Sequence, residues 1–225
     1  MEYMIKTEGV SRCFKTSGGD FWALKDINIE VPRGKLTILK GRSGSGKTTL
    51  LNILGALDKP TRGKVFFGEE NIARMDENKR AKLRRMQIGF VFQSVALLPM
   101  MTAFENVEYA LRMTNYKGDR AARTMECLKL VGLSQRMNHM PQELSGGEQQ
   151  RVAIARAIAH KPMVIFADEP TGALDTTTGL QVVKIFRELT EKEGVTIVMT
   201  THDTGLMELG DAVYELEDGE VVHGE

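Results

Sequence analysis

This sequence has few cysteines and no formal net charge. Its 225 residues include only two cysteines, Cys13 and Cys127, which lie far apart and in no spacing typical of metal ligands. This usage fits a reduced, cytosolic compartment. The 30 Lys and Arg residues balance the 30 Asp and Glu residues, so we expect no nucleic-acid partner. The one basic cluster, at 79–85, follows Asp76 and Glu77, and we expect it to form the solvated face of a short helix.

Long hydrophobic runs are also missing. No apolar stretch approaches the roughly 20 residues that a helix needs to cross a bilayer, and the longest, such as 163–167, have the length of buried strands. The first ten residues are mixed and charged, so we expect no secretory signal peptide. If the protein works at a membrane, we expect another chain to supply the membrane-spanning part.

Short apolar strands are present, and they are separated by helical patterns, as in an α/β fold. Continuous apolar runs predict strands of a parallel sheet that is buried on both faces. These runs lie at 35–40, 163–167 and 195–200. Further strands are predicted near the N-terminus at 24–31 and 64–68, and a closing hairpin at 213–222 that turns at Asp218-Gly219.

Two parts of the sequence have the spacing of amphipathic helices. Residues 94–160 are almost purely helical in pattern, so we expect a separate helical subdomain there. A later helix, which we expect to end at Gly194, has one apolar face made of Val182, Ile185, Phe186 and Leu189.

Residues 41–48, GRSGSGKT, match the phosphate-binding pattern G-x-x-x-x-G-K-[ST]. The context is the required one, because a predicted strand precedes the loop and a helical stretch that begins at Thr49 follows it. Glycines let such a loop wrap a phosphate closely, while its N–H groups and the helix N-terminus hold the charge. We expect Lys47 to reach the β- and γ-phosphates and the Thr48 hydroxyl to ligate Mg²⁺.

Two adjacent carboxylates, Asp168 and Glu169, follow the apolar strand at 163–167. A phosphate loop needs a distant carboxylate for its metal, and we expect Asp168 to face the Mg²⁺ shell. Glu169 would then point to the place from which a water attacks the γ-phosphate. The alternative is a pair of solvated charges at a strand end.

A second candidate phosphate site lies in ELSGGEQQRV, residues 143–152. Ser145 and Glu148 have the spacing of a capping box, and apolar residues follow at helical spacing, so a helix is predicted to begin here. Interior glycines cost a helix about 1 kcal/mol each relative to alanine, yet Gly146 and Gly147 occupy the first turn. A helix N-terminus free of side chains is a site for anions, most often phosphate. The alternative is a glycine-rich turn that enters an ordinary helix.

Together these motifs resemble those of the nucleotide-binding subunits of ABC transporters, over essentially the whole chain. Six motifs occur in the family's order: GRSGSGKT at 41–48, FVFQ at 90–93, LSGGEQQ at 144–150, VIFADEP at 164–170, ALD at 173–175 and THD at 201–203. The resemblance implies one domain over 1–225. Its P-loop NTPase core, with a parallel central sheet and an N-terminal antiparallel β subdomain, would occupy 1–93 and 161–225. An inserted α-helical subdomain would occupy 94–160.

The resemblance also implies an ATP hydrolase that works as a head-to-tail homodimer, with two ATP molecules and Mg²⁺ between the subunits. The catalytic residues would be Lys47, Glu169 and His202. Within one subunit, ATP would contact Phe14, Gly41, Arg42, Ser43, Gly44, Ser45, Gly46, Lys47, Thr48, Thr49 and Gln93. From the opposite subunit, it would contact Ser145, Gly146, Gly147, Glu148 and Asp175. Mg²⁺ would be held by Thr48, Gln93 and Asp168.

Two positions depart from the common pattern of the family. Phe14 stands where most relatives have a tyrosine that stacks on adenine, and Trp22 is a nearby alternative for that stacking. Arg42 stands where relatives commonly have proline, and we assign no function to this change. His139, His160 and His223 match no motif, and we expect them at the surface.

Several stretches, at 51–60, 97–99, 102–107 and 166–175, are most similar to small ATPases of lipoprotein-releasing, macrolide-exporting and bacitracin-resistance systems. That subgroup implies a separately encoded permease that has a large extracytoplasmic domain, and also an adaptor or two-component sensor. It further implies that this chain lies on the cytoplasmic side of the plasma membrane.

An alternative function that the sequence leaves open is that of a cell-division ATPase, which drives a membrane partner without transport. A soluble ATPase of DNA repair is disfavoured, because only about a hundred residues and no heptad run separate the phosphate loop from LSGGE. Translation ATPases carry two cassettes, and this chain has room for one.

The segment 94–104 is dense in apolar residues around a proline. We expect Leu98 and Phe104 to pack inside the helical subdomain. Methionine side chains adapt readily to a docking partner. We therefore expect Met100 or Met101 to be exposed and to contribute to a groove for a short helix of the permease.

Overall fold

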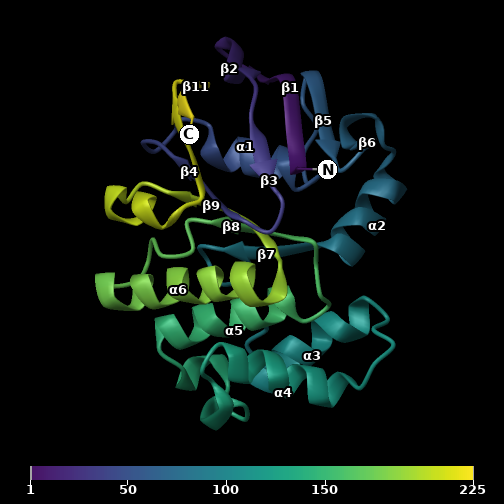
Figure 1. Ribbon diagram of the computed structural model, residues 1–225, viewed down its shortest axis with the longest axis vertical. Helices are drawn as coiled ribbons and strands as arrows, with labels where there is room; N and C mark the ends of the chain where they lie inside the picture. Colours follow the sequence, from purple (N-terminus) through teal and green to yellow (C-terminus); the bar gives the residue numbers. More distant parts are fainter. Residues whose placement is uncertain (1, 225) are drawn as a thin grey trace.

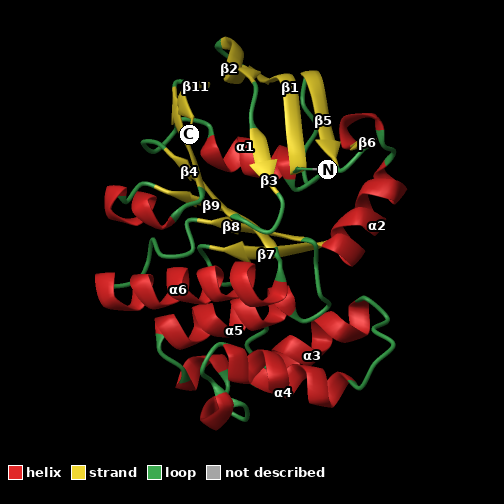
Figure 2. Ribbon diagram, viewed as in Figure 1, coloured by secondary structure: helices red, strands yellow, loops and turns green. Residues whose placement is uncertain are grey.

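The computed structural model describes residues 2–224 and contains two β-sheets with a helix, α1 (Lys47–Leu54), between them (Figures 1 and 2). The buried leucines and isoleucine of α1 share one hydrophobic core with residues of both sheets. Helices from residues 103–193 lie on the other side of the larger sheet, where a second core forms (Figure 1). The result is the layered α/β arrangement that the sequence predicts.

The smaller sheet is antiparallel and is built by the N-terminal part of the chain. β1 (Tyr3–Thr16) lies at its centre between β2 (Gly19–Ile27) and β5 (Arg62–Phe67). β3 (Glu30–Pro32) also pairs with β1, and β6 (Glu70–Asn71) pairs with β5. The apolar alternation at 24–31 therefore belongs to two strands rather than one, although all four of its apolar residues are buried, namely Leu24, Ile27, Ile29 and Val31.

The larger sheet has the strand order β11-β10-β4-β9-β8-β7. Its strands are β4 (Leu36–Lys40), β7 (Ile88–Phe92), β8 (Val164–Asp168), β9 (Thr196–Thr201), β10 (Ala212–Glu217) and β11 (Glu220–Gly224). Only β11 is antiparallel to its neighbour in this sheet, and the hairpin turns at Asp218-Gly219 as predicted. Because the carboxyl ends of parallel strands meet at one edge, the loops that follow β4, β7, β8 and β9 gather there.

The remaining helices are α2 (Glu77–Gln87), α3 (Ala103–Met113), α4 (Arg120–Leu130), α5 (Gly146–Ile158) and α6 (Thr176–Glu193), and short 3₁₀ turns lie between them. α6 buries Val182, Phe186 and Leu189, and it ends at Gly194 in the left-handed conformation, as predicted. The side chains of α3, α4 and α5 share one core with α6 and the larger sheet. Within the helical segment 94–160, α5 packs against β7 of the sheet that carries the site, and α3 and α4 pack against α5.

The basic cluster at 79–85 is only partly solvated, which corrects our expectation. Arg80 is 5% exposed, and its Nη2 donates to the carbonyl oxygens of Ala56 (2.6 Å) and Asp58 (2.8 Å). Arg84 also donates to the Ala56 carbonyl, at 2.7 Å. These carbonyls follow the end of α1, where cations are favoured by the helix dipole. Two arginines of α2 therefore bind the C-terminal end of the helix that follows the phosphate loop.

Two further side chains depart from the predicted burial. His160 is partly buried at the start of β7, where its Nε2 lies 3.1 Å from the Ile88 carbonyl oxygen, and burial lowers its pKa. Phe104 packs against the core as expected. Leu98 does not, because it stays 38% exposed.

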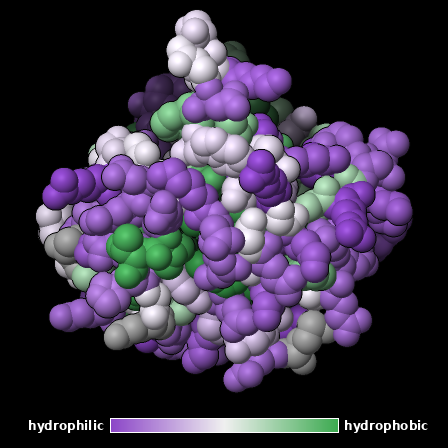
Figure 3. All heavy atoms as spheres, turned by 90° about the horizontal axis from the view of Figure 1, so that it is seen from above, coloured by the Kyte–Doolittle hydropathy of each residue, from purple (hydrophilic) through white to green (hydrophobic). Residues whose placement is uncertain are grey.

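Among residues 2–224, no helix is both long and apolar enough to span a bilayer. The face above the smaller sheet is mainly hydrophilic, with hydrophobic side chains in several separate areas (Figure 3). Exposed aromatic side chains of this sheet include Phe14 and Phe21, close to the turn that joins β1 to β2.

Candidate functional site

The phosphate loop, residues 41–46, joins β4 to the N-terminus of α1. Gly41 and Gly46 have positive φ angles of 155° and 105°. A Cβ at Gly41 would collide with the carbonyl of Leu216, and a Cβ at Gly46 would collide with the carbonyl of Ala23. The two ends of the loop therefore require glycine for close packing as well as for backbone conformation.

A buried cation lies inside this loop. Lys47 is 4% exposed, and its Nζ donates to the carbonyl oxygens of Gly41 (2.8 Å) and Arg42 (3.0 Å). A cleft of about 300 Å³ opens over the loop, and it is lined by Phe14, Phe21, Ala23, Ser43, Gly44, Gly46, Lys47, Thr48, Thr49 and Glu169. Most of the predicted loop residues thus face one cavity, whereas Gly41, Arg42 and Ser45 lie outside its lining.

Asp168 and Glu169 contact different partners at the end of β8. Asp168 Oδ1 accepts a hydrogen bond from Thr48 Oγ1 at 3.1 Å. Glu169 Oε1 lies 3.7 Å from Lys47 Nζ, and its Oε2 lies 3.4 Å from His202 Nδ1. Glu169 also has a positive φ of 43°, which is uncommon for a residue with a side chain and is a conformation often found at functional sites. The two carboxylates therefore face different protein groups, and their separate roles toward metal and water stay a prediction.

Thr200, on the neighbouring strand β9, contacts both of these acidic residues. Its Oγ1 donates to Asp168 Oδ1 at 2.8 Å and accepts from the Glu169 N–H at 2.8 Å. Thr200 is fully buried. Sequence reasoning missed this residue; its only signal is a hydroxyl near the end of an apolar strand, two residues before His202.

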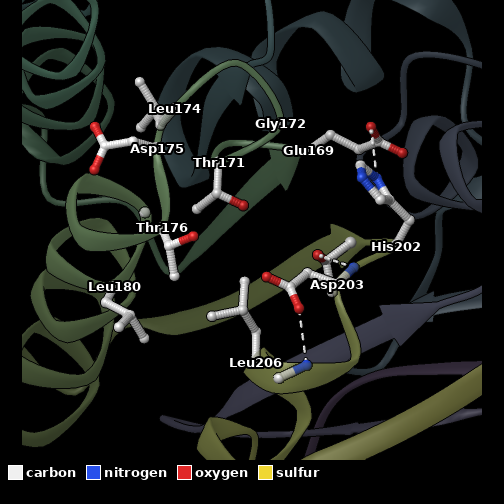
Figure 4. Close-up of a pocket in the computed structure, with 13 residues that line it drawn as sticks. Glu169, Thr171, Gly172, Leu174, Asp175, Thr176, Leu180, His202, Asp203 and Leu206 are labelled. Atoms are coloured by element: carbon white, nitrogen blue, oxygen red, sulfur yellow. Dashed lines mark hydrogen bonds and ion pairs between the residues drawn. The ribbon is translucent and has the colours of Figure 1, made fainter.

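A second cleft, of about 330 Å³, extends from Glu169 to the start of α6 (Figure 4). Glu169 and His202 face each other at one end, and Asp175 lies away from them at the other (Figure 4). Both carboxylate oxygens of Asp175 accept hydrogen bonds from Thr178, at 3.0 Å from its N–H and 2.6 Å from its hydroxyl. These hydrogen bonds lower the pKa of Asp175. Within its own subunit, Asp175 therefore caps α6.

Gln93 follows β7, next to the point where Phe92 pairs with Asp168. The turn after it is held by α5, because Arg156 donates to the carbonyl oxygens of Ala96 (2.7 Å) and Val95 (3.1 Å). Val95 and Ala96 both have positive φ angles, of 58° and 49°, which a β-branched residue rarely adopts. Arg156 thus links the helix of the LSGGE motif to the strained turn beside Gln93.

The N-terminus of α5 has the predicted capping box. Ser145 Oγ accepts from the Glu148 N–H at 3.3 Å, and the Glu148 carboxylate accepts from the Ser145 N–H at 2.9 Å. The hydrogen bond from the Ser145 backbone is the main cause that lowers the pKa of Glu148, and Arg136 adds to it at 3.1 Å. Ser145 and Glu148 line neither of the two clefts.

The two glycines of α5 have different surroundings. Gly146 is exposed, and a Cβ there would meet only Leu174 Cδ2, at 3.9 Å. Gly147 is buried, and a Cβ there would collide with Cγ2 of Thr178 in α6. The packing of α5 on α6 therefore explains Gly147 within one subunit. For Gly146, an ordinary contact distance leaves room for a side chain, so packing does not explain why glycine is present.

The register of β1 and β2 separates the three aromatic candidates. Phe14 lies directly opposite Phe21, whereas Trp22 lies opposite Cys13 on the other face of the sheet. Phe14 and Phe21 both line the cleft over the phosphate loop. Trp22 does not, and Arg62 lies over its ring at 5.1 Å. Trp22 is therefore excluded as the alternative to Phe14, and Phe21 is a further candidate that sequence reasoning missed.

A family model described as ABC transporter matches residues 24–172, which include the phosphate loop, the N-terminus of α5 and both strand-end carboxylates. The chain belongs to the ABC transporter family. It is 45% identical over 224 residues to the ABC transporter ATP-binding protein MJ0796 of Methanocaldococcus jannaschii, a match that covers 97% of this chain and 95% of that protein.

Further relatives agree with this assignment to the ABC family. The chain is 43% identical over 225 residues to the macrolide export ATP-binding/permease protein MacB of Agrobacterium fabrum, although it spans only 35% of that longer protein. A dimeric, post-hydrolysis structure of MJ0796 bound to ADP and Pi matches with a TM-score of 0.90 and 43% identity, over 99% of this chain and 98% of that one. The predicted fold and subgroup are confirmed. Membership implies ATP binding and ATPase activity.

The donors of this ABC cassette suit the Mg²⁺ that the family implies. Thr48 Oγ1 and Asp168 Oδ1 lie 3.1 Å apart, and Gln93 follows the strand that pairs with Asp168. All three supply oxygen ligands, which Mg²⁺ prefers, and Mg²⁺ commonly takes few protein ligands beside substrate phosphates. Residues 2–224 contain no group of three or more His, Cys, Asp and Glu side chains placed to hold a metal.

Proposed function

We propose that this chain hydrolyses ATP as the subunit of an ABC transporter, and that it dimerises on ATP to drive a separately encoded membrane permease. One observation carries the proposal. The Glu169 carboxylate lies between Lys47 Nζ (3.7 Å) and His202 Nδ1 (3.4 Å), beside the pair formed by Asp168 and Thr48. A base, a phosphate-binding cation and a metal-binding carboxylate at one edge of a sheet fit phosphoryl transfer to water.

Each residue has a separate task in this proposal. The N–H groups of the loop and the Lys47 ammonium bind the β- and γ-phosphates. Thr48, Asp168 and Gln93 hold Mg²⁺, which neutralises charge on the phosphate oxygens when it is bound. Glu169 accepts a hydrogen bond from the attacking water and orients it. His202 holds the Glu169 carboxylate in place and adds a donor near the γ-phosphate.

The remaining site residues serve the ATP of a partner subunit. Ser145, Gly146 and Glu148 lie outside both clefts of their own chain, which supports a role toward a second copy. The hydroxyl hydrogen of Ser145 and the N–H groups of the first turn of α5 are donors that a γ-phosphate could accept. Asp175 and Gly147 would line the same interface while they also stabilise their own subunit.

The membrane partner would bind the segment after Gln93. Met100 is 84% exposed, which agrees with our expectation that one of the two methionines is accessible. The similarity to MacB, whose name includes a permease and macrolide export, supports export, antibiotic or antimicrobial-peptide resistance, or lipoprotein release. The permease would have a large extracytoplasmic domain, with an adaptor or two-component sensor nearby. The subunit would sit at the cytoplasmic side of the plasma membrane.

Phosphate release from MgATP by the purified chain tests the ATPase assignment. We expect turnover that requires Mg²⁺, and a loss of at least a hundredfold in Lys47→Ala, because removing a preorganised cation from the developing charge costs several kcal/mol. Lys59→Ala is the control, since Lys59 is an exposed lysine outside the cleft. Hydrolysis that persists in Lys47→Ala would contradict the proposal.

A further inference from the structure

We propose that Phe21 is a second base-binding residue, and that Phe14 and Phe21 form an aromatic shelf that favours a purine over a pyrimidine nucleotide. This inference deepens the proposed function and rests on it. The shelf is defined by these two rings alone. Three features support it: the strand register, the attachment of β2 to the phosphate loop, and the fixed position of Phe14.

The register places the two rings side by side. Phe14 and Phe21 are direct cross-strand partners, and such partners have Cβ atoms about 4.5–5.5 Å apart on one face of the sheet. Both rings line the cleft over the phosphate loop. Phe21 is 56% exposed and Phe14 is 37% exposed, so both offer an apolar surface that a ligand can cover.

β2 packs closely against the phosphate loop at Ala23, two residues after Phe21. The carbonyl oxygen of Ala23 and the side chain of Leu24 lie so close to Gly46 that a Cβ on Gly46 would collide with both. The β10–β11 turn adds a second link, because the Gly219 N–H donates to the Ser45 carbonyl at 3.1 Å and the Gly219 carbonyl accepts from the Lys25 N–H at 2.7 Å. The distance from the shelf to the phosphate site is therefore set by backbone contacts.

The side chain of Arg12 packs on the ring of Phe14 and holds it in position. The Arg12 guanidinium lies 4.4 Å from the ring centroid. It is itself held by Asp58, which accepts from Nε at 2.8 Å and from Nη2 at 3.1 Å. Arg12 does not line the cleft, so the ring surface that faces the cleft stays free for a base.

Stacking on such a shelf depends on the size of the base. Aromatic side chains bind every base through its π-face, without reading its hydrogen-bonding edge. The two fused rings of a purine can cover both Phe14 and Phe21, whereas the single ring of a pyrimidine covers one. The two residues of β2 that line the cleft, Phe21 and Ala23, have no polar side-chain group. Selection should therefore act on base size.

Calorimetric titration of the full chain with ADP, CDP and pyrophosphate tests this inference, because ADP and CDP lack the γ-phosphate that the proposed reaction releases and pyrophosphate has no base. In Phe21→Ala, we expect the Kd of ADP to rise about fivefold or more, at the lower end of the loss typical of base–aromatic stacking. The Kd values of CDP and pyrophosphate should change less than twofold. Trp22→Ala is the matched control and should leave all three unchanged, since Trp22 lies on the opposite face.

A second variant keeps an aromatic ring at position 21, and ligand binding to it can be followed by tryptophan fluorescence. Trp22 is the only tryptophan of the chain, so the double variant Phe21→Trp with Trp22→Phe moves the only indole onto the shelf. ADP should quench the emission of this variant strongly, pyrophosphate should not, and the wild-type chain should respond weakly to both. Equal ADP affinity in Phe21→Ala and wild type, or no quenching in the double variant, would overturn the role of Phe21. A wild-type chain that binds no ADP would instead contradict the proposed function.

Discussion

Thr178 of α6 packs against Gly147 of α5 so closely that a Cβ on Gly147 would collide with the Thr178 methyl group. The same Thr178 donates two hydrogen bonds to Asp175. The LSGGE motif and the ALD motif are therefore joined inside one subunit. Because of this contact, a substitution at Gly147 changes helix packing as well as any contact with a partner's nucleotide, so it cannot separate the two roles.

Gly146 provides the cleaner test of the phosphate clamp. In Gly146→Asp, we expect the fold and the ADP affinity of the monomer to stay near wild type, because the site is exposed and has room for a side chain. ATP hydrolysis should fall at least tenfold, since a carboxylate would face the partner's γ-phosphate and like charges in an interface repel strongly. Gly147→Ala should instead lower Tm by several degrees, as overpacking costs about 1–3 kcal/mol. Loss of ADP binding in Gly146→Asp would count against the two-subunit site.

Thr200 should position both acidic residues. Thr200→Val keeps the shape and removes the hydroxyl that binds Asp168 Oδ1 and the Glu169 N–H. We expect kcat to fall about tenfold and the Mg²⁺ concentration for half-maximal activity to rise, because hydrogen bonds to charged groups contribute about 1.5–3 kcal/mol. Thr200→Ser should restore most of both values. A valine variant with wild-type kcat and Mg²⁺ dependence would show that the hydroxyl is dispensable.

Arg156 should hold the turn after Gln93. Arg156 is partly buried, and burial lowers its pKa. Its hydrogen bonds go to the carbonyls of Val95 and Ala96, two residues in a conformation that costs of order 1–3 kcal/mol each. In Arg156→Gln, amide hydrogen exchange of residues 94–98 should increase markedly. The control is Arg151→Gln on the same helix, which does not contact this turn. Unchanged exchange in Arg156→Gln would mean that other contacts hold the turn.

Met100 should mark the surface that binds the permease. Met100→Glu should fold and keep its basal ATPase activity when it is expressed alone, since the side chain is 84% exposed. Co-expressed with the permease, it should fail to co-purify, because a charge would be buried against an apolar helix. Met125→Glu, an exposed methionine of α4, is the control. If Met100→Glu co-purifies with the permease as wild type does, this segment is not the docking surface.

Much of the fold follows from local patterns. Three strands of the larger sheet, β4, β8 and β9, are apolar runs of strand length, the phosphate loop has its own signature, and Ser145 and Glu148 form the capping box that their spacing predicts. The motifs also predict which strand ends meet, because the carboxyl ends of parallel strands share an edge.

What the sequence does not predict depends on contacts between distant segments. The role of Thr200 arises because β9 lies beside β8. The choice of Phe21 over Trp22 depends on the register of β1 and β2, which shifts between Arg12 and Cys13. Arg80 is buried because the end of α1 offers it free carbonyl oxygens, and a cluster of charges in the sequence gives no sign of such a partner.

The catalytic role of Glu169 and the ATP-driven dimer are tested together by Glu169→Gln. Glutamine keeps the shape of Glu169 and removes its charge, so the variant should bind ATP with near-wild-type affinity and lose nearly all turnover. Size-exclusion chromatography with light scattering should then show a monomer without nucleotide and a stable dimer with MgATP. Wild-type hydrolysis by Glu169→Gln, or a variant that binds ATP and stays monomeric, would contradict the account.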